Sequence, residues 1–257
     1  MKNIAIITGA SSGMGREFLL TLENYGSFDE VWAVARREER LIELSKISKT
    51  PVKPVALDLS KEASLKEFSR LLSEEDVSVG LLVNASGFGK FRAVMDTELD
   101  DNLNMIDLNC RAVAALCQIT VPYMRSGGDI INIASVAAFQ PIPYIDVYAA
   151  TKAFVLSYSR ALNRELKSRK IHVMAVCPFW TKTEFFDRAI AADEEPIVKK
   201  YAAMYMPEDI VKRAWRDVKK GKDVSMYGFV ARGQKLLVKL LPHSLVMNVW
   251  MGQQSLK

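Results

Sequence analysis

The chain has 257 residues, a formal net charge of +5 at pH 7, 49% hydrophobic residues and 25% charged residues. This length and composition fit one globular domain that buries a core. Three cysteines without a repeated spacing and only two histidines argue against a disulfide framework and a metal site, and no basic run with interleaved aromatic residues suggests nucleic-acid binding.

The amino-terminal sequence MKNIAIITGASS breaks after a short apolar run, which is not typical of a secretory signal. No apolar stretch reaches the roughly 18 residues that a spanning helix needs. We therefore expect a reduced, cytoplasmic compartment and no membrane-spanning segment.

Short apolar runs alternate with helical patterns along the whole chain. Strands are expected at 3–8, 30–36, 52–59, 79–86, 128–135, 170–178 and 223–228. Helices are expected at about 14–26, 37–47, 64–74, 96–124, 147–168 and 207–221. Runs of Val, Ile and Ala separated by helices are typical of a parallel sheet covered on both faces. The prediction is an α/β, doubly wound (Rossmann) sheet of about seven strands in a single domain, 1–257.

Two segments depart from this alternation. Residues 179–206 are rich in aromatic side chains without a clear period, which favours a substrate loop or lid. Residues 229–257 set Leu and Val beside Lys and Arg with a break at Pro242, as an amphipathic tail would. Such a tail either touches a membrane surface or packs on the domain or on a partner subunit.

The stretch TGASSGMGR, 8–16, lies between the first strand and the first helix. Gly9, Gly13 and Gly15 permit positive φ and let backbone N–H groups approach a pyrophosphate at a helix N-terminus. The alternative is a glycine-rich turn without a ligand.

The second strand ends in VWAVARREER, where Arg36 and Arg37 follow and no acidic residue closes the strand. An acid there would hold the ribose 2′-hydroxyl of NAD and repel a 2′-phosphate. A guanidinium instead pairs with phosphate through two hydrogen bonds. The sequence therefore favours NADP(H), with Arg36 as phosphate ligand, unless these arginines lie on a solvated helix face.

Tyr148 and Lys152 are four residues apart in PYIDVYAATKAF, so they share one helix face. Ser135 ends the fifth strand. Ligands of doubly wound folds bind beyond the carboxyl ends of the strands, where Ser135 and the glycine loop both lie. In a purely structural interpretation Ser135 would cap a helix, and Tyr148 and Lys152 would be a packing pair.

Together these pieces resemble the short-chain dehydrogenase/reductase family over about residues 3–230. The likeness rests on TGASSGMG, NASG at 84–87, Asn109 in MIDLNC, Ser135, YAATK at 148–152, and CPFWTKT after the sixth strand.

The resemblance implies a catalytic set of Asn109, Ser135, Tyr148 and Lys152. Tyr148 would exchange a proton with the substrate oxygen, Ser135 would position that oxygen, and Lys152 would hold the nicotinamide ribose. Asn109 would support a water in a proton relay. Free tyrosine has a pKa of about 10, so we expect Lys152 and the oxidised nicotinamide to lower it by roughly 3 units, worth about 4 kcal/mol.

The resemblance also implies a cofactor-binding set. Asp58 would lie near the adenine, Asn84 and Gly87 along the adenosine, and Pro178 and Thr183 around the nicotinamide. The full set is Gly9, Ser11, Ser12, Gly13, Met14, Gly15, Arg36, Asp58, Asn84, Gly87, Tyr148, Lys152, Pro178 and Thr183. Three positions depart from the family pattern: NNAG is NASG here, with Ala85 for asparagine and Ser86 for alanine, and Phe179 replaces the glycine after Pro178.

The sequence therefore predicts an NADP(H)-dependent oxidoreductase that reduces a carbonyl group on an apolar substrate, such as a ketone, an aldehyde or a fatty-acyl group. The candidate pocket residues are Phe88, Phe139, Tyr144, Phe179, Trp180, Phe185 and Phe186. Two alternatives remain: a hydroxyl dehydrogenase acting on a steroid-like or fatty-acyl-like alcohol, and a non-catalytic dinucleotide-binding regulatory protein. The family resemblance implies a homodimer or homotetramer, paired through the helices that start near residues 96 and 147.

Overall fold

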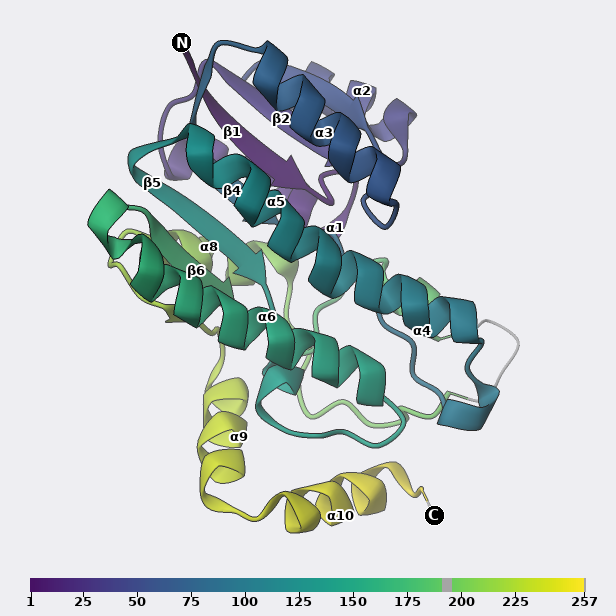
Figure 1. The fold of residues 1–257 in the computed structure, drawn as a ribbon. Coiled ribbons are helices and arrows are strands. Elements are labelled where there is room, and N and C mark those ends of the chain that lie inside the picture. The colour runs from purple at the N-terminus through teal and green to yellow at the C-terminus, as the bar shows by residue number, and fades with distance from the viewer. Residues whose placement is uncertain (191–195, 257) are drawn as a thin grey trace.

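A computed structural model describes residues 1–190 and 196–256. Its strands form one seven-stranded sheet in the order β3-β2-β1-β4-β5-β6-β7, and every pairing is parallel (Figure 1). The strands are β1 (Lys2–Thr8), β2 (Glu30–Ala35), β3 (Val52–Ala56), β4 (Val77–Asn84), β5 (Met124–Ile133), β6 (His172–Val176) and β7 (Val224–Ser225). The doubly wound parallel sheet expected from the sequence is confirmed.

Alternate residues of each strand face opposite helical layers, which explains why the strands are apolar throughout. In β1, Ile4 and Ile6 belong to one buried cluster, and Ala5 and Ile7 belong to the other. The first cluster includes side chains of α3 (Glu62–Glu74), α5 (Ala112–Thr120) and α6 (Asp146–Glu165). The second includes side chains of α1 (Gly13–Leu20), α2 (Glu38–Ile47) and α8 (Pro207–Val218).

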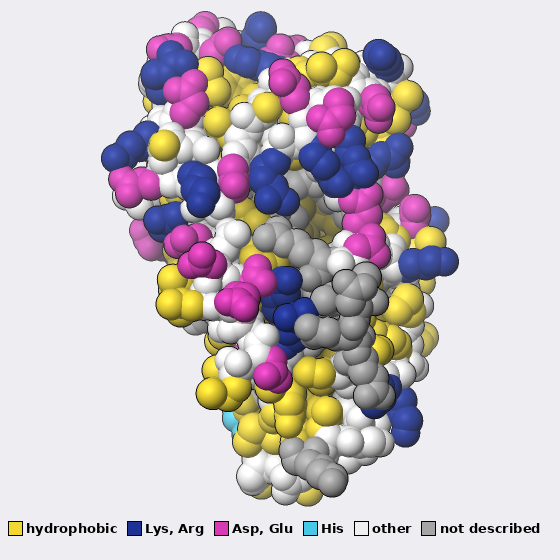
Figure 2. All heavy atoms as spheres, turned by 90° about the vertical axis from the view of Figure 1, so that its right-hand side faces the viewer, with side chains coloured by type: hydrophobic (Ala, Val, Ile, Leu, Met, Phe, Trp, Pro, Cys, Tyr) yellow, Lys and Arg dark blue, Asp and Glu magenta, His cyan; other side chains and the backbone are white. Residues whose placement is uncertain are grey.

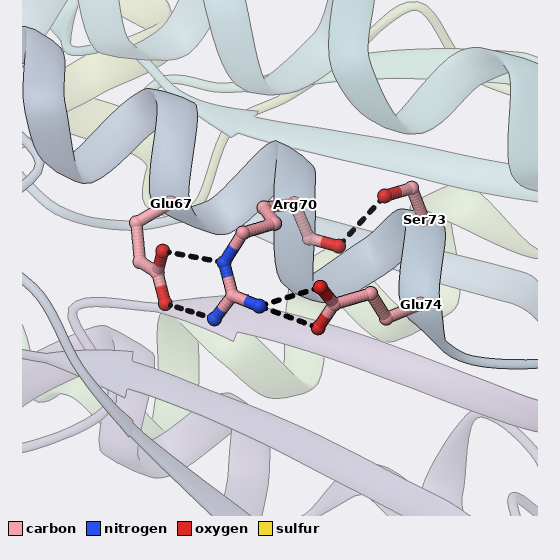
Figure 3. Close-up of polar contacts among 4 residues, drawn as sticks. All are labelled: Glu67, Arg70, Ser73 and Glu74. Carbon is pink, nitrogen blue, oxygen red and sulfur yellow. Dashed lines mark hydrogen bonds and ion pairs between the residues drawn. The ribbon is translucent and has the colours of Figure 1, made fainter.

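Helix α3 shows how these covering helices divide their surface. Leu65, Phe68 and Leu72 are buried against the sheet. On the solvent side, the Arg70 guanidinium donates to Glu67 and Glu74, one turn away in either direction (Figure 3). Exposed ion pairs within one helix contribute little to stability, so the apolar face is what fixes α3 on the sheet.

The long helix expected over residues 96–124 is interrupted. The chain forms α4 (Leu99–Ile106), a π-helical turn η3 (Asp107–Arg111) and then α5. A π-helical turn accommodates an extra residue and is often found at functional sites. The apolar period in the sequence carries no sign of it, because the pattern continues through the turn.

Short 3₁₀ segments complete the connections; they are η1 (Leu22–Asn24), η2 (Val94–Asp96), η4 (Val121–Tyr123), η5 (Val136–Phe139) and η6 (Leu166–Arg169). Beyond β6, the predicted loop 179–206 contains α7 (Phe185–Ala189), and its residues 191–195 lie outside the described part. That this loop acts as a lid stays a prediction, as does the single-domain boundary.

The C-terminal segment forms two helices, α9 (Phe229–Leu240) and α10 (His243–Gln254), which extend below the sheet in Figure 1. The indole of Trp250 donates to the Pro143 carbonyl at 3.0 Å. The Gln254 amide oxygen accepts from the Lys199 and Lys200 backbone. These bonds tie α10 to the loop before α6 and to the end of the 179–206 segment. Among the described residues, no helix has the length and apolar character to cross a bilayer.

A buried polar network joins β4, β5 and α6 behind the carboxyl edge of the sheet. Asn132 is fully buried; its amide oxygen accepts from Asn84 at 2.9 Å and its amide nitrogen donates to the Ser159 hydroxyl at 2.9 Å. Ser159 in turn donates to the Val155 carbonyl at 2.6 Å. This chain of bonds fixes the position of α6 relative to the two central strands.

Replacing Asn132 by alanine should lower the free energy of unfolding by about 1–3 kcal/mol, because the buried amide of Asn84 then keeps only the weak Cys117 sulfur as acceptor. Urea unfolding measures this loss. The exposed Asn248→Ala on α10 is the matched control and should change the free energy by less than about 0.5 kcal/mol. Equal effects of the two substitutions would contradict a structural role for the network.

Candidate active site

The carboxyl ends of the strands open into a cavity of about 1180 Å³ that reaches from the glycine loop to α9 and α10. Most of the residues predicted as functional line it, namely Gly9, Ser11, Ser12, Gly13, Met14, Arg36, Asp58, Gly87, Ser135, Tyr148, Lys152, Pro178 and Thr183. Residues far apart in the sequence are therefore brought to one edge of the sheet.

The glycine loop forms a cradle that side chains would fill. Gly9 has φ +66°, and a Cβ there would lie 2.7 Å from the Ala85 carbonyl oxygen. Gly13 has φ +54° and begins α1, and a Cβ would lie 3.3 Å from the Thr183 side chain. Ser12 makes no side-chain cap, so the first backbone N–H groups of α1 are left for a ligand. This arrangement fits the pyrophosphate of a dinucleotide.

Gly15 serves a different purpose from the other two glycines. It is buried and does not line the cavity, and a Cβ at this position would collide with the Gly9 carbonyl. It lets α1 pack tightly against the turn after β1, and its expected cofactor contact stays a prediction.

The Asn84 side chain belongs to the buried polar network. It is 2% exposed, does not line the cavity, and points to Asn132 and the Cys117 thiol. The expected place of Asn84 along the adenosine stays a prediction. The next two residues turn the loop, because the backbone N–H groups of Ala85 and Ser86 both donate to the Thr8 hydroxyl.

Asn109 lies in the π-helical turn η3, fully buried and one layer behind the cavity. Its amide donates to the Phe88 carbonyl at 2.8 Å and accepts from the Phe88 N–H at 3.1 Å. A Cβ on Gly87 would lie 2.9 Å from the Asn109 amide oxygen. Asn109 thus shapes the 87–88 backbone, whereas the sequence predicted a residue in direct support of a water relay.

Ser135, Tyr148 and Lys152 converge from the end of β5 and the first turns of α6. The Ser135 hydroxyl accepts from the Ala137 N–H at 3.1 Å, so it caps η5, and it lies near enough to the Tyr148 side chain to act on its pKa. The Lys152 ammonium donates to the Ile133 carbonyl at 2.9 Å and lies 5.6 Å from the centre of the Tyr148 ring.

Burial sets the protonation states of these groups. It raises the pKa of Tyr148 to about 12, although the hydrogen bond from Ser135 works in the opposite direction. Burial lowers the pKa of Lys152 to about 8. The sequence predicted a lowered Tyr148 pKa, and the protein alone does not produce it. In the protein without cofactor, Tyr148 is a neutral phenol, and the ammonium of Lys152 beside it loses its proton more easily than a free lysine.

Arginines line the cavity at its glycine-loop end, beyond the end of β2. Arg36 is exposed and forms no ion pair within the described residues. Arg37 donates to the Ser11 hydroxyl at 3.3 Å and to Glu184 at 3.0 Å, and Arg40 donates to Glu184 at 2.6 Å. Asp58 accepts from the Ser60 N–H at 3.1 Å, which turns the chain after β3 toward the cavity. Reasoning from the sequence missed Arg40 and Glu184, because their pairing depends on the folded chain.

The substrate side of the cavity is apolar. Of the predicted aromatic residues, Phe88, Phe179, Trp180, Phe185 and Phe186 line it, whereas Phe139 and Tyr144 do not. Sequence reasoning missed Phe91, whose ring lies 6.2 Å from that of Tyr148. It also missed the wall contributed by α9, α10 and the turn between them, which includes Leu237, Val238, Leu241, Val246, Val249 and Trp250.

A sequence model of the family described as short chain dehydrogenase matches residues 3–194. The chain belongs to this family. This short-chain dehydrogenase is 27% identical over 255 residues to the human very-long-chain 3-oxoacyl-CoA reductase, covering 95% of this chain and 75% of the human protein.

Solved structures of the family share its fold. A short-chain dehydrogenase from Sphingobium yanoikuyae in complex with NADPH is 28% identical, with a TM-score of 0.77 over 92% of both chains. One from Burkholderia phymatum in complex with NAD is 21% identical, with a TM-score of 0.78 over 91% of this chain and 92% of that one. The family resemblance is thus confirmed, and oxidoreductase activity with a nicotinamide dinucleotide is supported.

Replacing Lys152 by methionine should stabilise this short-chain dehydrogenase at pH 7 by about 1–3 kcal/mol. The reason is the cost of burying the ammonium, roughly 3 kcal/mol, less about 1 kcal/mol for its bond to the Ile133 carbonyl. The folded chain releases this proton near pH 8 and the unfolded chain near pH 10.5, so wild-type stability should rise with pH between these values.

Urea unfolding at pH 7 and pH 10 measures the effect, and the advantage of the variant should shrink at the higher pH. Lys46→Met, at an exposed position of α2, is the control and should show no such pH dependence. An advantage that stays constant with pH would contradict a lowered pKa for Lys152.

Proposed function

We propose that this protein is an NADP(H)-dependent reductase of a carbonyl group on a bulky apolar substrate. The observation that carries the proposal is the convergence of Ser135, Tyr148 and Lys152 on a cavity that has an apolar wall at one end and a glycine loop with arginines at the other. The residues named as catalytic and cofactor-binding are part of this proposal.

A bound nicotinamide supplies the hydride for the carbonyl carbon. Tyr148 donates its phenol proton to the carbonyl oxygen as negative charge develops there. Because its pKa is raised, Tyr148 stays protonated across neutral pH, which favours the reduction direction. The Ser135 hydroxyl, which lies beside Tyr148, turns its single O–H to the same oxygen, donates to it and orients the carbonyl group.

Lys152 and Asn109 support this chemistry from behind. An ammonium has three donors, and Lys152 uses one for the Ile133 carbonyl. The others can hold the hydroxyls of a nicotinamide ribose beside Tyr148. Asn109 acts as a positioning residue, since it fixes the backbone at Gly87 and Phe88 against which the cofactor lies.

The preference for NADP(H) rests on charge at the end of β2. Arg36 is exposed at the cavity with no carboxylate paired to it in the described structure, and no acidic residue ends the strand. The relative from Sphingobium yanoikuyae was solved with NADPH, which adds support. The structure from Burkholderia phymatum was solved with NAD, so membership of the family does not by itself imply a preference for NADP(H).

An apolar substrate is favoured by the aromatic wall and by the aliphatic residues of α9 and α10. The similarity to a very-long-chain 3-oxoacyl-CoA reductase agrees with a carbonyl on a long apolar chain. A hydroxyl dehydrogenase would use the same groups in reverse. A regulatory dinucleotide-binding protein would have no use for the Ser135, Tyr148 and Lys152 constellation.

Two surfaces suit partners. Leu99, Leu103 and Ile106 on α4 and Phe154 on α6 are exposed, and we propose that they meet a second copy of the chain in a homodimer or homotetramer. Hydrophobic side chains also gather toward the lower end of the face in Figure 2, over the C-terminal helices. Residues 228–257 contain no acidic residue, so this surface suits peripheral contact with anionic lipid. A cytoplasmic location stays a prediction.

Tyr148→Phe should lower kcat/KM for the reduction of a bulky ketone by about 10²–10⁴-fold, because the ring still packs but the proton donor is lost. NADPH oxidation with a panel of bulky ketones measures turnover, and calorimetry should show NADPH affinity within about threefold of wild type. Turnover that survives unchanged would rule out this mechanism. A wild-type protein that binds NADPH without any turnover would favour the regulatory alternative.

Arg36→Asp should weaken NADPH binding by at least about tenfold and reverse the preference toward NADH, since the carboxylate repels the 2′-phosphate and accepts from the ribose 2′-hydroxyl of NADH. Calorimetry with both dinucleotides measures the ratio. Arg216→Asp, on the exposed side of α8, makes the same charge change away from the cavity and should leave the ratio unchanged. Equal NADPH and NADH affinities in the wild type would remove the proposed preference.

A further inference from the structure

Glu184 connects the substrate side of the cavity to the arginines beyond β2. One of its carboxylate oxygens lies 3.0 Å from the Arg37 guanidinium, and the other lies 2.6 Å from that of Arg40. Arg40, and after it Arg37, hold the pKa of this carboxyl below its usual range. Glu184 is therefore an anion at neutral pH with both oxygens engaged.

The pairing joins three separate segments at the cofactor end of the cavity. Arg37 also donates to Ser11 in the glycine loop, and a Cβ on Gly13 of that loop would lie 3.3 Å from the Thr183 side chain. All of these residues line the cavity. The contrast with Arg70 is instructive, since Arg70 pairs with carboxylates of its own helix on an open surface (Figure 3).

We propose that Glu184 is an internal competitor for the 2′-phosphate of NADP(H). Its carboxylate occupies Arg37 and Arg40 in the free protein, and the phosphate replaces it there. The inference rests on the proposed NADP(H) preference and adds a specificity-determining residue to it.

Charge and solvation favour the exchange. Carboxylate and phosphate both match the fork of a guanidinium, and two anions cannot share the same pair of arginines without repulsion. A phosphate carries the larger charge and more acceptor oxygens, so it gains more from the two arginines. The Glu184 side chain is 45% exposed even when paired, so it returns to water at little cost.

The exchange also links the phosphate to the substrate pocket. Glu184 directly precedes α7, and the ring of Phe185 lies 5.4 Å from that of Tyr148. NADH has no 2′-phosphate and leaves the Glu184 contacts in place. The 2′-phosphate of NADPH would displace Glu184 from Arg37 and Arg40. The start of α7, which carries part of the aromatic wall, then loses this anchor.

The test uses adenosine 2′,5′-bisphosphate, which carries the 2′-phosphate without a nicotinamide, and 5′-AMP, which lacks it. Calorimetry should show that Glu184→Gln binds the bisphosphate roughly three- to tenfold more tightly than wild type, the range that two exposed ion pairs supply. Affinity for 5′-AMP should stay within about twofold. Glu38→Gln removes a charge from the first turn of α2, forms no pair with these arginines, and should change neither affinity.

Amide hydrogen exchange on the wild type is a second measurement that needs no variant. Exchange at residues 183–187 should rise with the bisphosphate and not with 5′-AMP. Unchanged or weaker bisphosphate binding by Glu184→Gln would overturn the proposal, because the carboxylate would then be a bystander or a support for the arginines. If the wild type itself binds the bisphosphate no better than 5′-AMP, the NADP(H) preference fails first and the competitor role fails with it.

Discussion

The reversal of strand order beside β1 is the constraint on which the rest of this structure depends. β1 pairs with β2 on one side and with β4 on the other. The chain leaves β1 toward α1 in one helical layer, and leaves β4 toward α5 in the opposite layer. The crevice between the two layers receives the N-terminus of α1, the turn after β4 and the end of β5. Thr8 joins two of these turns directly, because its hydroxyl accepts from the backbone after β4.

The site built on this edge contains features that oppose stability. Lys152 is 5% exposed, and a charge so placed is costly unless it is bonded. Its bond to the Ile133 carbonyl offsets part of that cost and also fixes where the ammonium stands relative to Tyr148. The polar network at Asn132 ties α6 to β5, so Tyr148 and Lys152 keep their position relative to Ser135 after that strand. Buried polar groups of β5 and α6 therefore hold the proposed catalytic residues in place.

Local patterns in the sequence were enough for the sheet, the glycine loop and the Ser135, Tyr148 and Lys152 constellation, because strand periodicity, helical spacing and positive φ are local properties. They were not enough for Asn84, which sits in a family motif but turns its side chain to Asn132. They also gave no sign of the π-helical turn at Asn109 or of the pairing of Glu184 with Arg37 and Arg40. Each of these depends on contacts between segments that are distant in sequence.

The two ends of the cavity differ in how far family membership explains them. The glycine loop, the arginines and the proposed catalytic residues all lie within the family match of residues 3–194. The apolar wall formed by Leu237, Val246 and Trp250 lies beyond it. The proposed chemistry and cofactor class therefore rest on the part that the family model matches. The substrate end combines aromatic residues of that part with C-terminal helices beyond it. Under the proposed function, the apolar character of this wall would select among carbonyl substrates.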